Sequence, residues 1–405
     1  MASQILSTFD AALKIDYLPV IREQLNNTNL LTSKIQRNER DVSGKRWQLT
    51  AHTKRNSGVG AGTETGLPTA GYQTCTNPYG TVKYNRGRIS VSGPTIEASK
   101  DDKGAMARAL ESEIKGVTAD LKKDVNYQLF NDGTGCRGIV SVDPVTGTTL
   151  TLGNTTTRYI SDGMLIDILA PEGEETTSGT DLTVNTVDNS TELTLSAAIN
   201  ADVAVGDWVT RANATNDTTG SSFVCYEMMG LKGIIDDGTY VLTLHNITRS
   251  SAPYWDCSTS STDSNSGTLR DITWDLIQAQ ITAVEANGGK TNLIISDHSI
   301  RDAYAALVVS DKRFVNTMKL DGGFTALEYN GLPWVADGDC PANTVFFVDT
   351  DHLELMQMSD WSWMDRDGAV LSRVSGEDAY EAVLYWYADL ATDKPRAHSF
   401  LRDVQ

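Results

Sequence analysis

The stretch DTDHLEL at 349–355 brings four potential metal ligands close together: Asp349, Asp351, His352 and Glu354. Carboxylate oxygens and imidazole nitrogens are common ligands of divalent cations in proteins. A calcium loop also needs a glycine at its sharp turn and a longer series of ligands at fixed spacing, and this stretch lacks that glycine and that spacing. The pattern is more typical of a solvated turn, so we expect no metal and no other cofactor.

Catalytic residue types also occur without a catalytic arrangement. Asp297, His298 and Ser299 are consecutive, and consecutive side chains cannot face one another as a triad must. Ser299 with Asp302 instead matches a capping box, which predicts the start of a helix. The glycines of SGVGAGT (57–63) lack the Gly-Lys-Ser/Thr ending of a phosphate-binding loop. We therefore expect that the chain is not an enzyme.

The composition is that of a folded protein of two or three domains. The chain has 405 residues, of which 40% are hydrophobic and 21% charged, close to ordinary globular usage. No run approaches the roughly 20 apolar residues that span a bilayer, and the N-terminus lacks the basic start of a secretion signal. Five widely spaced cysteines show no metal-ligand pattern. We expect no membrane partner.

The charges divide the chain into two parts. The formal net charge is -19, but residues 1–100 hold 13 Lys and Arg against 7 Asp and Glu, whereas the remainder holds 21 against 46. Either this is chance variation along a surface, or a basic arm lies against an acidic body, its own or a neighbour's. Because a net acidic protein repels phosphates outside local basic patches, general nucleic-acid affinity is not expected.

The first hundred residues predict an arm followed by a long hairpin. Residues 2–29 have the spacing of two short helices, which need a partner surface to be stable. Strands are expected around 47–53 and 81–91, joined by a glycine-rich tip around 58–80. Such a tip is either a flexible surface loop or an arm that becomes ordered on a neighbouring subunit.

One long amphipathic helix follows the hairpin. Ser99 with Asp102 matches a capping box, and Gly133 ends the apolar stripe. The stripe consists of Met106, Leu110, Ile114, Val117, Leu121, Val125 and Leu129. About 30 residues at 1.5 Å each give a helix of roughly 45 Å, long enough to span an extended subunit.

The remaining chain divides into a β-rich segment and an α/β region. Residues 141–222 are rich in Thr, Asp, Asn and Gly, and they hold 12 acidic residues against Arg158 and Arg211. Their alternating hydrophobicity predicts a small all-β insertion. Beyond it we expect helices over 272–286 and 299–309, and strands over 291–296, 327–335, 344–347, 379–390 and 397–401.

Taken in this order, the elements resemble the major capsid proteins of tailed bacteriophages, which have the Hong Kong 97 fold. Local sequence is also similar to that family, in segments that cover most of the chain except the insertion. These segments are YLPVIREQLNNTNLLTSKI (17–35), GVGAGTETGLPTAGYQT (58–74), EYNGLPWVADGDCPANTVFFVD (328–349) and DAYEAVLYWYADLATDKPRAHSFL (378–401). Each segment is typical of the family but none is diagnostic by itself, so the resemblance depends on the order in which the segments occur.

The resemblance implies an α+β fold with an N-terminal arm, an extended β-hairpin loop, a long spine helix, peripheral and axial domains and an all-β insertion domain. The implied parts are 1–46 (N-terminal arm), 47–94 (extended loop), 95–140 (peripheral domain with the spine helix), 141–222 (insertion domain), 223–349 (axial domain) and 350–405 (closing strands of the peripheral and axial domains). In the family the extended loop lies over the adjacent subunit. The candidate inter-subunit contacts are therefore Lys54, Arg55, Lys83, Arg86 and Arg88, as basic residues that meet an acidic neighbour.

The function that the resemblance implies is self-assembly, as hexamers and pentamers, into an icosahedral shell that matures from a precursor as DNA enters. The implied partners are other copies of the chain, a scaffolding protein, a portal protein and packaged double-stranded DNA, which is held on the inner face without sequence specificity. A decoration protein is an open alternative. The chain begins almost at the arm, which implies a separate scaffold or prior cleavage. The implied location is the virion capsid, assembled in the host bacterial cytoplasm.

Three alternatives stay open. Encapsulins, which are enzyme-loading cellular compartments, share the same fold. The Thr-, Asn- and Asp-rich insertion would suit a surface-layer or adhesin-type binding protein, although the missing secretion signal argues against this class. A hydrolase centred on Asp351 and His352 is the least favoured alternative.

Overall fold

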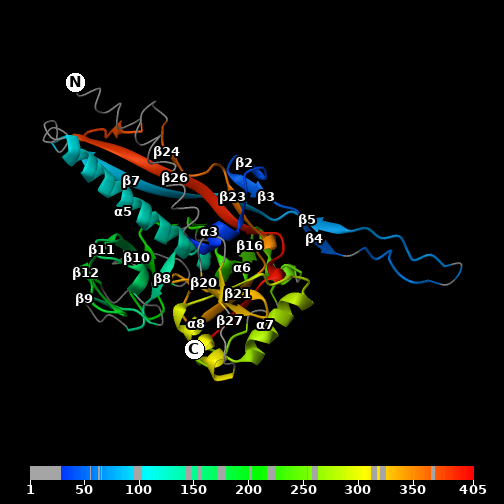
Figure 1. Cartoon of the computed structure of the whole chain (residues 1–405). Coiled ribbons are helices and arrows are strands. Elements are labelled where there is room, and N and C mark those ends of the chain that lie inside the picture. The colour runs from blue at the N-terminus through cyan, green and yellow to red at the C-terminus, as the bar shows by residue number, and fades with distance from the viewer. Residues whose placement is uncertain are drawn as a thin grey trace. The chain divides into compact units, whose positions relative to one another are not determined.

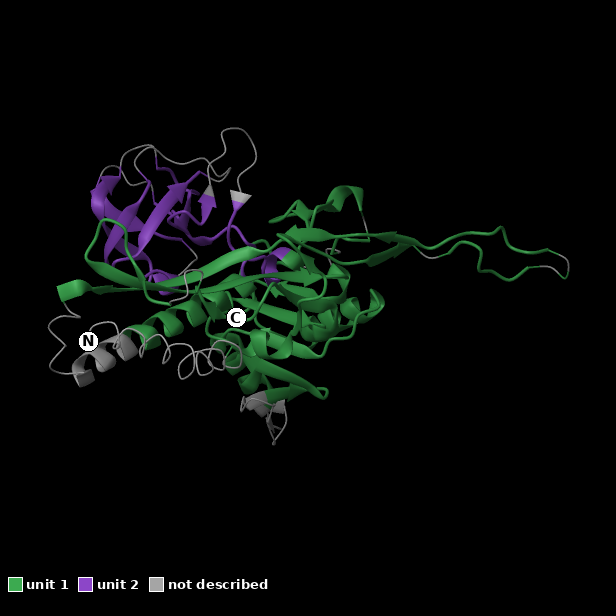
Figure 2. Cartoon of the chain, turned by 90° about the horizontal axis from the view of Figure 1, so that it is seen from above, with its two compact units in different colours: residues 1–129, 234–405 green, residues 130–233 purple. Residues whose placement is uncertain are grey.

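The computed structural model forms two compact units (Figure 2), residues 1–129 with 234–405 (unit 1) and residues 130–233 (unit 2). The arm helices predicted over 2–29 fall, apart from Asn29, outside the described residues. No helix in the described part of the chain is long and apolar enough to cross a membrane. The residues that the structure describes are 29–54, 56–62, 64, 66–94, 103–142, 147–153, 157–170, 179–199, 203–216, 224–252, 254–257, 263–311, 317–319, 325–365 and 370–405.

The first sheet of unit 1 is built on one long strand, β26 (Ala379–Thr392), drawn in red in Figure 1. It pairs antiparallel with β7 (Lys83–Ser92) over ten residues, from Ala379 opposite Ser92 to Ala388 opposite Lys83. Buried and exposed residues alternate along β7, as in a sheet with one packed and one solvated face. The other strands are β23 (Leu353–Gln357), β24 (Ser362–Trp363) and β25 (Ser372–Arg373), which pair with β26, and β1 (Gln36–Asn38), which pairs in parallel with β23.

Helix α5 (Lys103–Phe130) packs against the buried face of this sheet. Leu121 and Val125 are buried, four residues apart on one helix face. A Cβ added to Gly87 of β7 would lie 2.6 Å from Leu121 Cδ1, so helix and strand backbone are in direct contact. The predicted long helix is thus confirmed from Lys103 onward. The short helix α3 (Leu30–Lys34) precedes β1 and is largely buried.

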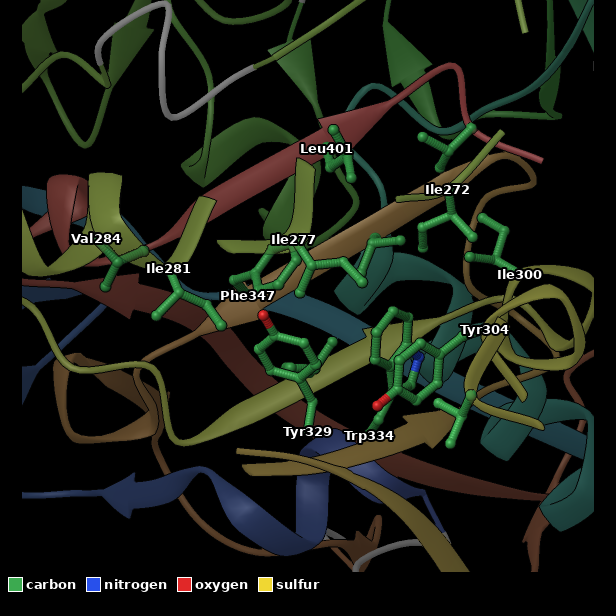
Figure 3. Close-up of a cluster of buried hydrophobic side chains, with 14 residues drawn as sticks. Ile272, Ile277, Ile281, Val284, Ile300, Tyr304, Tyr329, Trp334, Phe347 and Leu401 are labelled. Atoms are coloured by element: carbon green, nitrogen blue, oxygen red, sulfur yellow. The ribbon is translucent and has the colours of Figure 1, made fainter. Parts of the chain in front are cut away.

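A second six-stranded sheet forms the α/β region of unit 1. Its parallel pair β18 and β21 is connected through α8, as the predicted alternation of strands and helices requires. Figure 3 shows the core of this region, where Tyr304 and Trp334 stack at 4.2 Å between ring centroids and Ile277 and Ile281 of α7 are buried. The sheet order is β19 (Thr317–Lys319), β20 (Thr325–Tyr329), β21 (Leu332–Ala336), β18 (Leu293–Ser296), β22 (Thr344–Val348) and β27 (Ser399–Arg402), with helices α7 (Trp274–Ala286) and α8 (His298–Asp311).

A buried arginine organises the chain between α6 (Leu231–Ile234) and α7. The Arg249 side chain is 2% exposed and donates to the carbonyl oxygens of Ile234, Asp236 and Val241. These bonds hold the hairpin of β16 (Thr243–Leu244) and β17 (Ile247–Thr248), which is closed by two residues with positive φ, His245 (48°) and Asn246 (65°). Such φ values are those of a tight type I′ turn.

Unit 2 contains a six-stranded ring of strands around its own core. Val140 and Leu152 form a bridge, and Gly153 N donates to Ile139 O at 2.8 Å, so the first and last strands of the sheet also meet. Closure of a sheet into a ring pairs its two edge strands with each other, which limits pairing with strands of other chains. The sheet order is β8 (Cys136–Ile139), β13 (Trp208–Arg211), β10 (Leu165–Leu169), β11 (Leu182–Val187), β12 (Glu192–Ile199) and β9 (Gly147–Thr151), and a separate pair is β14 (Thr215–Asn216) with β15 (Val224–Cys225).

Two ion pairs join the segments through which the chain enters and leaves this barrel. Lys232 Nζ lies 2.9 Å from Asp132 Oδ2, and Arg137 lies 3.3 Å from Glu227 Oε1 with both side chains almost fully buried. Burial raises the pKa of Asp132, but Lys232 and the Thr134 hydrogen bonds outweigh it, so the net pKa is lowered. Unit 2 is therefore wider than the predicted insertion of 141–222, because β8 and these pairs lie outside that range.

Replacement of Arg137 by methionine should destabilise unit 2 strongly. It removes the cation that faces the buried Glu227 carboxylate, and breaking a buried pair on one side costs about 3–5 kcal/mol. Chemical denaturation followed by circular dichroism measures the loss. Arg301→Met is the matched control, because its pair with Asp302 is solvent-exposed and contributes about 1 kcal/mol or less. Equal losses in the two variants would contradict the role of the buried pair.

Candidate functional site

The extended hairpin is formed by β4 (Ala51–Lys54) and β5 (Thr74–Thr76), which pair with each other and with no other strand of the described chain (Figure 1). Its tip carries large apolar side chains in solvent: Val59, Leu67 and Tyr72 are 64%, 94% and 82% exposed. Apolar side chains at such exposure are unusual as a group and are typical of a surface that another molecule covers.

The base of the hairpin is fixed to the rest of unit 1 by Trp47. This residue lies in a three-stranded sheet of β2 (Val42–Ser43), β3 (Arg46–Gln48) and β6 (Tyr79–Thr81). Its side chain is fully buried, and Nε1 donates to Asp389 Oδ2 of β26 at 3.0 Å. The indole packs directly on Gly80, because a Cβ at this position would clash with the ring at a distance of 2.6 Å.

His245 also packs against Trp47, which anchors the base of the hairpin. Its ring meets Trp47 edge to face at 4.6 Å, and its carbonyl oxygen accepts a hydrogen bond from Tyr79 N at 3.2 Å. Burial, with the charge of Arg249, lowers the pKa of His245 to about 3. The imidazole is therefore neutral at neutral pH, and the anchor does not depend on its charge.

Gly80→Ala should loosen the hairpin base. The added methyl group displaces the Trp47 indole, and overpacking of this kind costs about 1–3 kcal/mol. The thermal midpoint and the rate of proteolysis within 56–73 measure the effect. Gly60→Ala is the control on the same hairpin, because a Cβ there meets no atom within 4 Å. An unchanged Gly80→Ala protein would contradict the anchor.

The five predicted contact residues do not all lie on the hairpin. Lys54 is exposed at the end of β4, and Arg55 lies outside the described residues. Lys83, Arg86 and Arg88 lie on the strand predicted around 81–91, which is β7 and pairs with β26. That strand is amphipathic, and its partner lies about 300 residues further along the chain. The role of these residues as contacts between subunits stays a prediction.

Arg86 and Arg88 instead form part of a half-exposed face of the β7–β26 ladder. Tyr84 and Tyr387 meet edge to face at 5.0 Å, and the Arg86 guanidinium lies 5.5 Å and 5.9 Å from their ring centroids. Arg88 forms an ion pair with Glu381. We call this the tyrosine–arginine face, and its residues are Tyr84, Arg86, Arg88, Glu381, Val383, Tyr385 and Tyr387. The tyrosines were not predicted as contact residues, although the alternation of Tyr84, Arg86 and Arg88 along one strand was a signal for them.

The candidate metal ligands are not brought together. Asp349 accepts hydrogen bonds from the backbone of Lys290 and Asp351, whereas Glu354 accepts one from Asn38. Within the described residues, no group of three or more His, Cys, Asp or Glu side chains has an arrangement that holds a metal ion. Helix α8 begins at His298, one residue earlier than the Ser299 capping box predicted, and Ser299 Oγ donates to Asp297.

His352 pairs with Asp393, Nδ1 to Oδ1 at 2.9 Å. This hydrogen bond outweighs burial and raises the pKa of His352; Asp349 also raises it and Lys394 opposes it. The pair should stabilise the protein below about pH 6.5 and lose that effect as pH rises through the raised pKa, by at most about 1 kcal/mol because the pair is partly exposed. An NMR titration of His352 checks this: Asp393→Asn should lower its pKa, and no change would contradict the assignment.

Comparison with known proteins gives a likeness in structure. No family model matches the sequence, and no curated protein is similar to it. A chain of the cyanophage A-1(L) capsid asymmetric unit is similar over 95% of this chain and 92% of its own, at 15% identity and a TM-score of 0.56. The SrpI encapsulin of Synechococcus elongatus PCC 7942 (8% identity, 94% and 89% coverage, TM-score 0.48) and a chain of Mycobacterium phage Bobi (9% identity, 93% and 90% coverage, TM-score 0.45) are less similar.

The likeness to the cyanophage chain shows the fold. It extends over nearly the whole of both chains, so it includes both units and not a single shared domain. The predicted α+β capsid fold of the Hong Kong 97 type is therefore confirmed.

Proposed function

We propose, from the capsid fold that the chain shares with the cyanophage subunit, that this protein is the major capsid protein of a tailed bacteriophage. Its copies would assemble as hexamers and pentamers into an icosahedral shell around double-stranded DNA. The observation that carries the proposal is the likeness over 95% of this chain. A scaffolding protein, a portal protein, assembly in the host cytoplasm and a final place in the virion capsid belong to the same proposal.

The hairpin supports self-association in a specific way. Burial of a large apolar side chain contributes about 1.5–3 kcal/mol, and the exposed Leu67 and Tyr72 make no such contribution in a single chain. A contact between the tip of one copy and a different surface of the next is heterologous, and heterologous contacts form rings when the rotation closes. Lys54, exposed at the end of β4, adds attraction toward an acidic neighbour.

Electron microscopy tests the proposal. The full chain is expressed with and without the product of a neighbouring scaffold gene and is viewed in negative stain. Closed shells are expected, and small discrete oligomers under all assembly conditions would overturn the proposal. The contents then decide between the two shell functions: packaged DNA agrees with a capsid, whereas packaged cellular enzyme would assign the chain to the encapsulins.

The double variant Leu67→Ser with Tyr72→Ser should assemble poorly while each chain stays folded. Each lost side chain costs about 1.5–3 kcal/mol of contact energy. Since about 1.4 kcal/mol is a factor of ten, the concentration needed for assembly should rise at least tenfold. Light scattering gives that concentration, and the thermal midpoint reports folding. Thr69→Ser is a control on the same exposed tip. Normal assembly of the double variant would exclude the tip as a contact.

A further inference from the structure

The tyrosine–arginine face is an outward sheet face with the side chains of an interface. Tyr84 is 43% exposed and the Arg88 side chain 61% exposed, while Val383, Tyr385 and Tyr387 are half-buried. The opposite face of the same ladder packs on α5, so this is the face that a partner can reach. At a strand spacing of about 3.3 Å per residue, the ten-residue ladder is roughly 33 Å long.

The residue types at these positions differ from those of a merely solvated sheet. Tyrosine and arginine are enriched in protein interfaces, whereas lysine and glutamate are depleted there. The arginines are also held in place: Arg86 lies over two tyrosine rings and Arg88 is paired with Glu381. A face on which one guanidinium group is held by aromatic rings and another by an ion pair is suited to a partner that carries carboxylates.

The barrel of unit 2 carries such carboxylates at one end. Asp162 Oδ1 accepts from Val187 N at 2.8 Å, and Asp188 accepts hydrogen bonds from Thr186 and Thr194. Glu192, in the same hairpin, accepts from the side chain of Asn189. We call Asp162, Asp188 and Glu192 the acidic end. Asp162 and Asp188 are exposed and Glu192 is half-buried, with Arg158 as the one basic residue of the sequence 141–199.

The net charge decides which partner is favoured. A chain with a net charge of -19 repels its own copies, so contacts between copies are favoured where basic surfaces meet acidic ones. The acidic excess of this chain is concentrated beyond residue 100, and its barrel segment has 12 acidic residues against two basic ones. The acidic end of one copy therefore complements the tyrosine–arginine face of another.

We propose that the tyrosine–arginine face binds the acidic end of unit 2 of a second copy of this chain. The inference rests on the proposed shell function and names one of its contacts. Arg86 and Arg88 meet Asp188 and Glu192, and the tyrosine rings exclude water around the guanidinium groups. This contact joins two unlike surfaces, as the heterologous contacts of a ring do.

A charge exchange in the full chain tests the contact. Arg86→Glu with Arg88→Glu should raise the concentration needed for assembly at least tenfold, and added Asp188→Arg with Glu192→Arg should restore it. Arg40→Glu with Arg301→Glu is the control for a charge change elsewhere, and the thermal midpoint reports folding. Normal assembly of the first variant, or no restoration by the second, would overturn the contact.

A disulfide cross-link distinguishes a contact between two copies from a contact within one copy. In a Cys75→Ser background, chains with Arg86→Cys and chains with Asp188→Cys are mixed before assembly and oxidised with diamide. A disulfide-linked dimer of the two variants is expected, and none is expected for Arg301→Cys with Asp188→Cys. A third variant carries both Arg86→Cys and Asp188→Cys. If only this variant forms the disulfide, and forms it within one chain, the proposal is overturned.

The remaining outcomes are also distinguishable. If Arg86→Glu with Arg88→Glu gives normal shells that package less DNA, the tyrosine–arginine face binds DNA, and the proposed contact is overturned. If the unmodified chain forms no shells at all, the shell function itself fails, independently of these variants.

Discussion

Strand β26 is the constraint on which the rest of unit 1 depends. Its ten-residue ladder with β7 fixes which side chains face α5 and which face outward, because side chains alternate along a strand. The same strand supplies Asp389, which accepts the Trp47 hydrogen bond and so holds the base of the extended hairpin. A shift of one residue in the ladder would exchange its two faces and move that carboxylate away from the indole.

The proposed self-assembly has to overcome a strong like charge on every copy. Two kinds of surface offset that repulsion: the apolar hairpin tip, whose burial is independent of charge, and the basic strands, which attract acidic segments. Because charged contacts are screened by salt and apolar contacts are not, the two contributions should separate with ionic strength. The hairpin and the tyrosine–arginine face therefore have complementary roles in the proposed shell.

Unit 2 has a hydrophobic core of its own, and its strands close into a barrel. The described strands of the barrel close into a ring through the Val140–Leu152 bridge, and the buried Arg137–Glu227 pair joins the segments through which the chain enters and leaves it. A segment built in this way can present surface carboxylates without contributing strands to the sheets of unit 1. This explains how a Thr-, Asn- and Asp-rich composition is compatible with an ordered unit.

Local patterns in the sequence determined the long helix, the α/β region and the strands of the insertion, because periods of 3.6 and 2 residues are read within a short window. They also determined the exposed glycine-rich tip. Only the tertiary structure decided that Arg86 and Arg88 lie beside Tyr387, that Trp47 is bonded to Asp389, and that the barrel closes between Val140 and Leu152. The strands that form the ladder are separated by about 300 residues, and no local pattern specifies which distant strand supplies the partner.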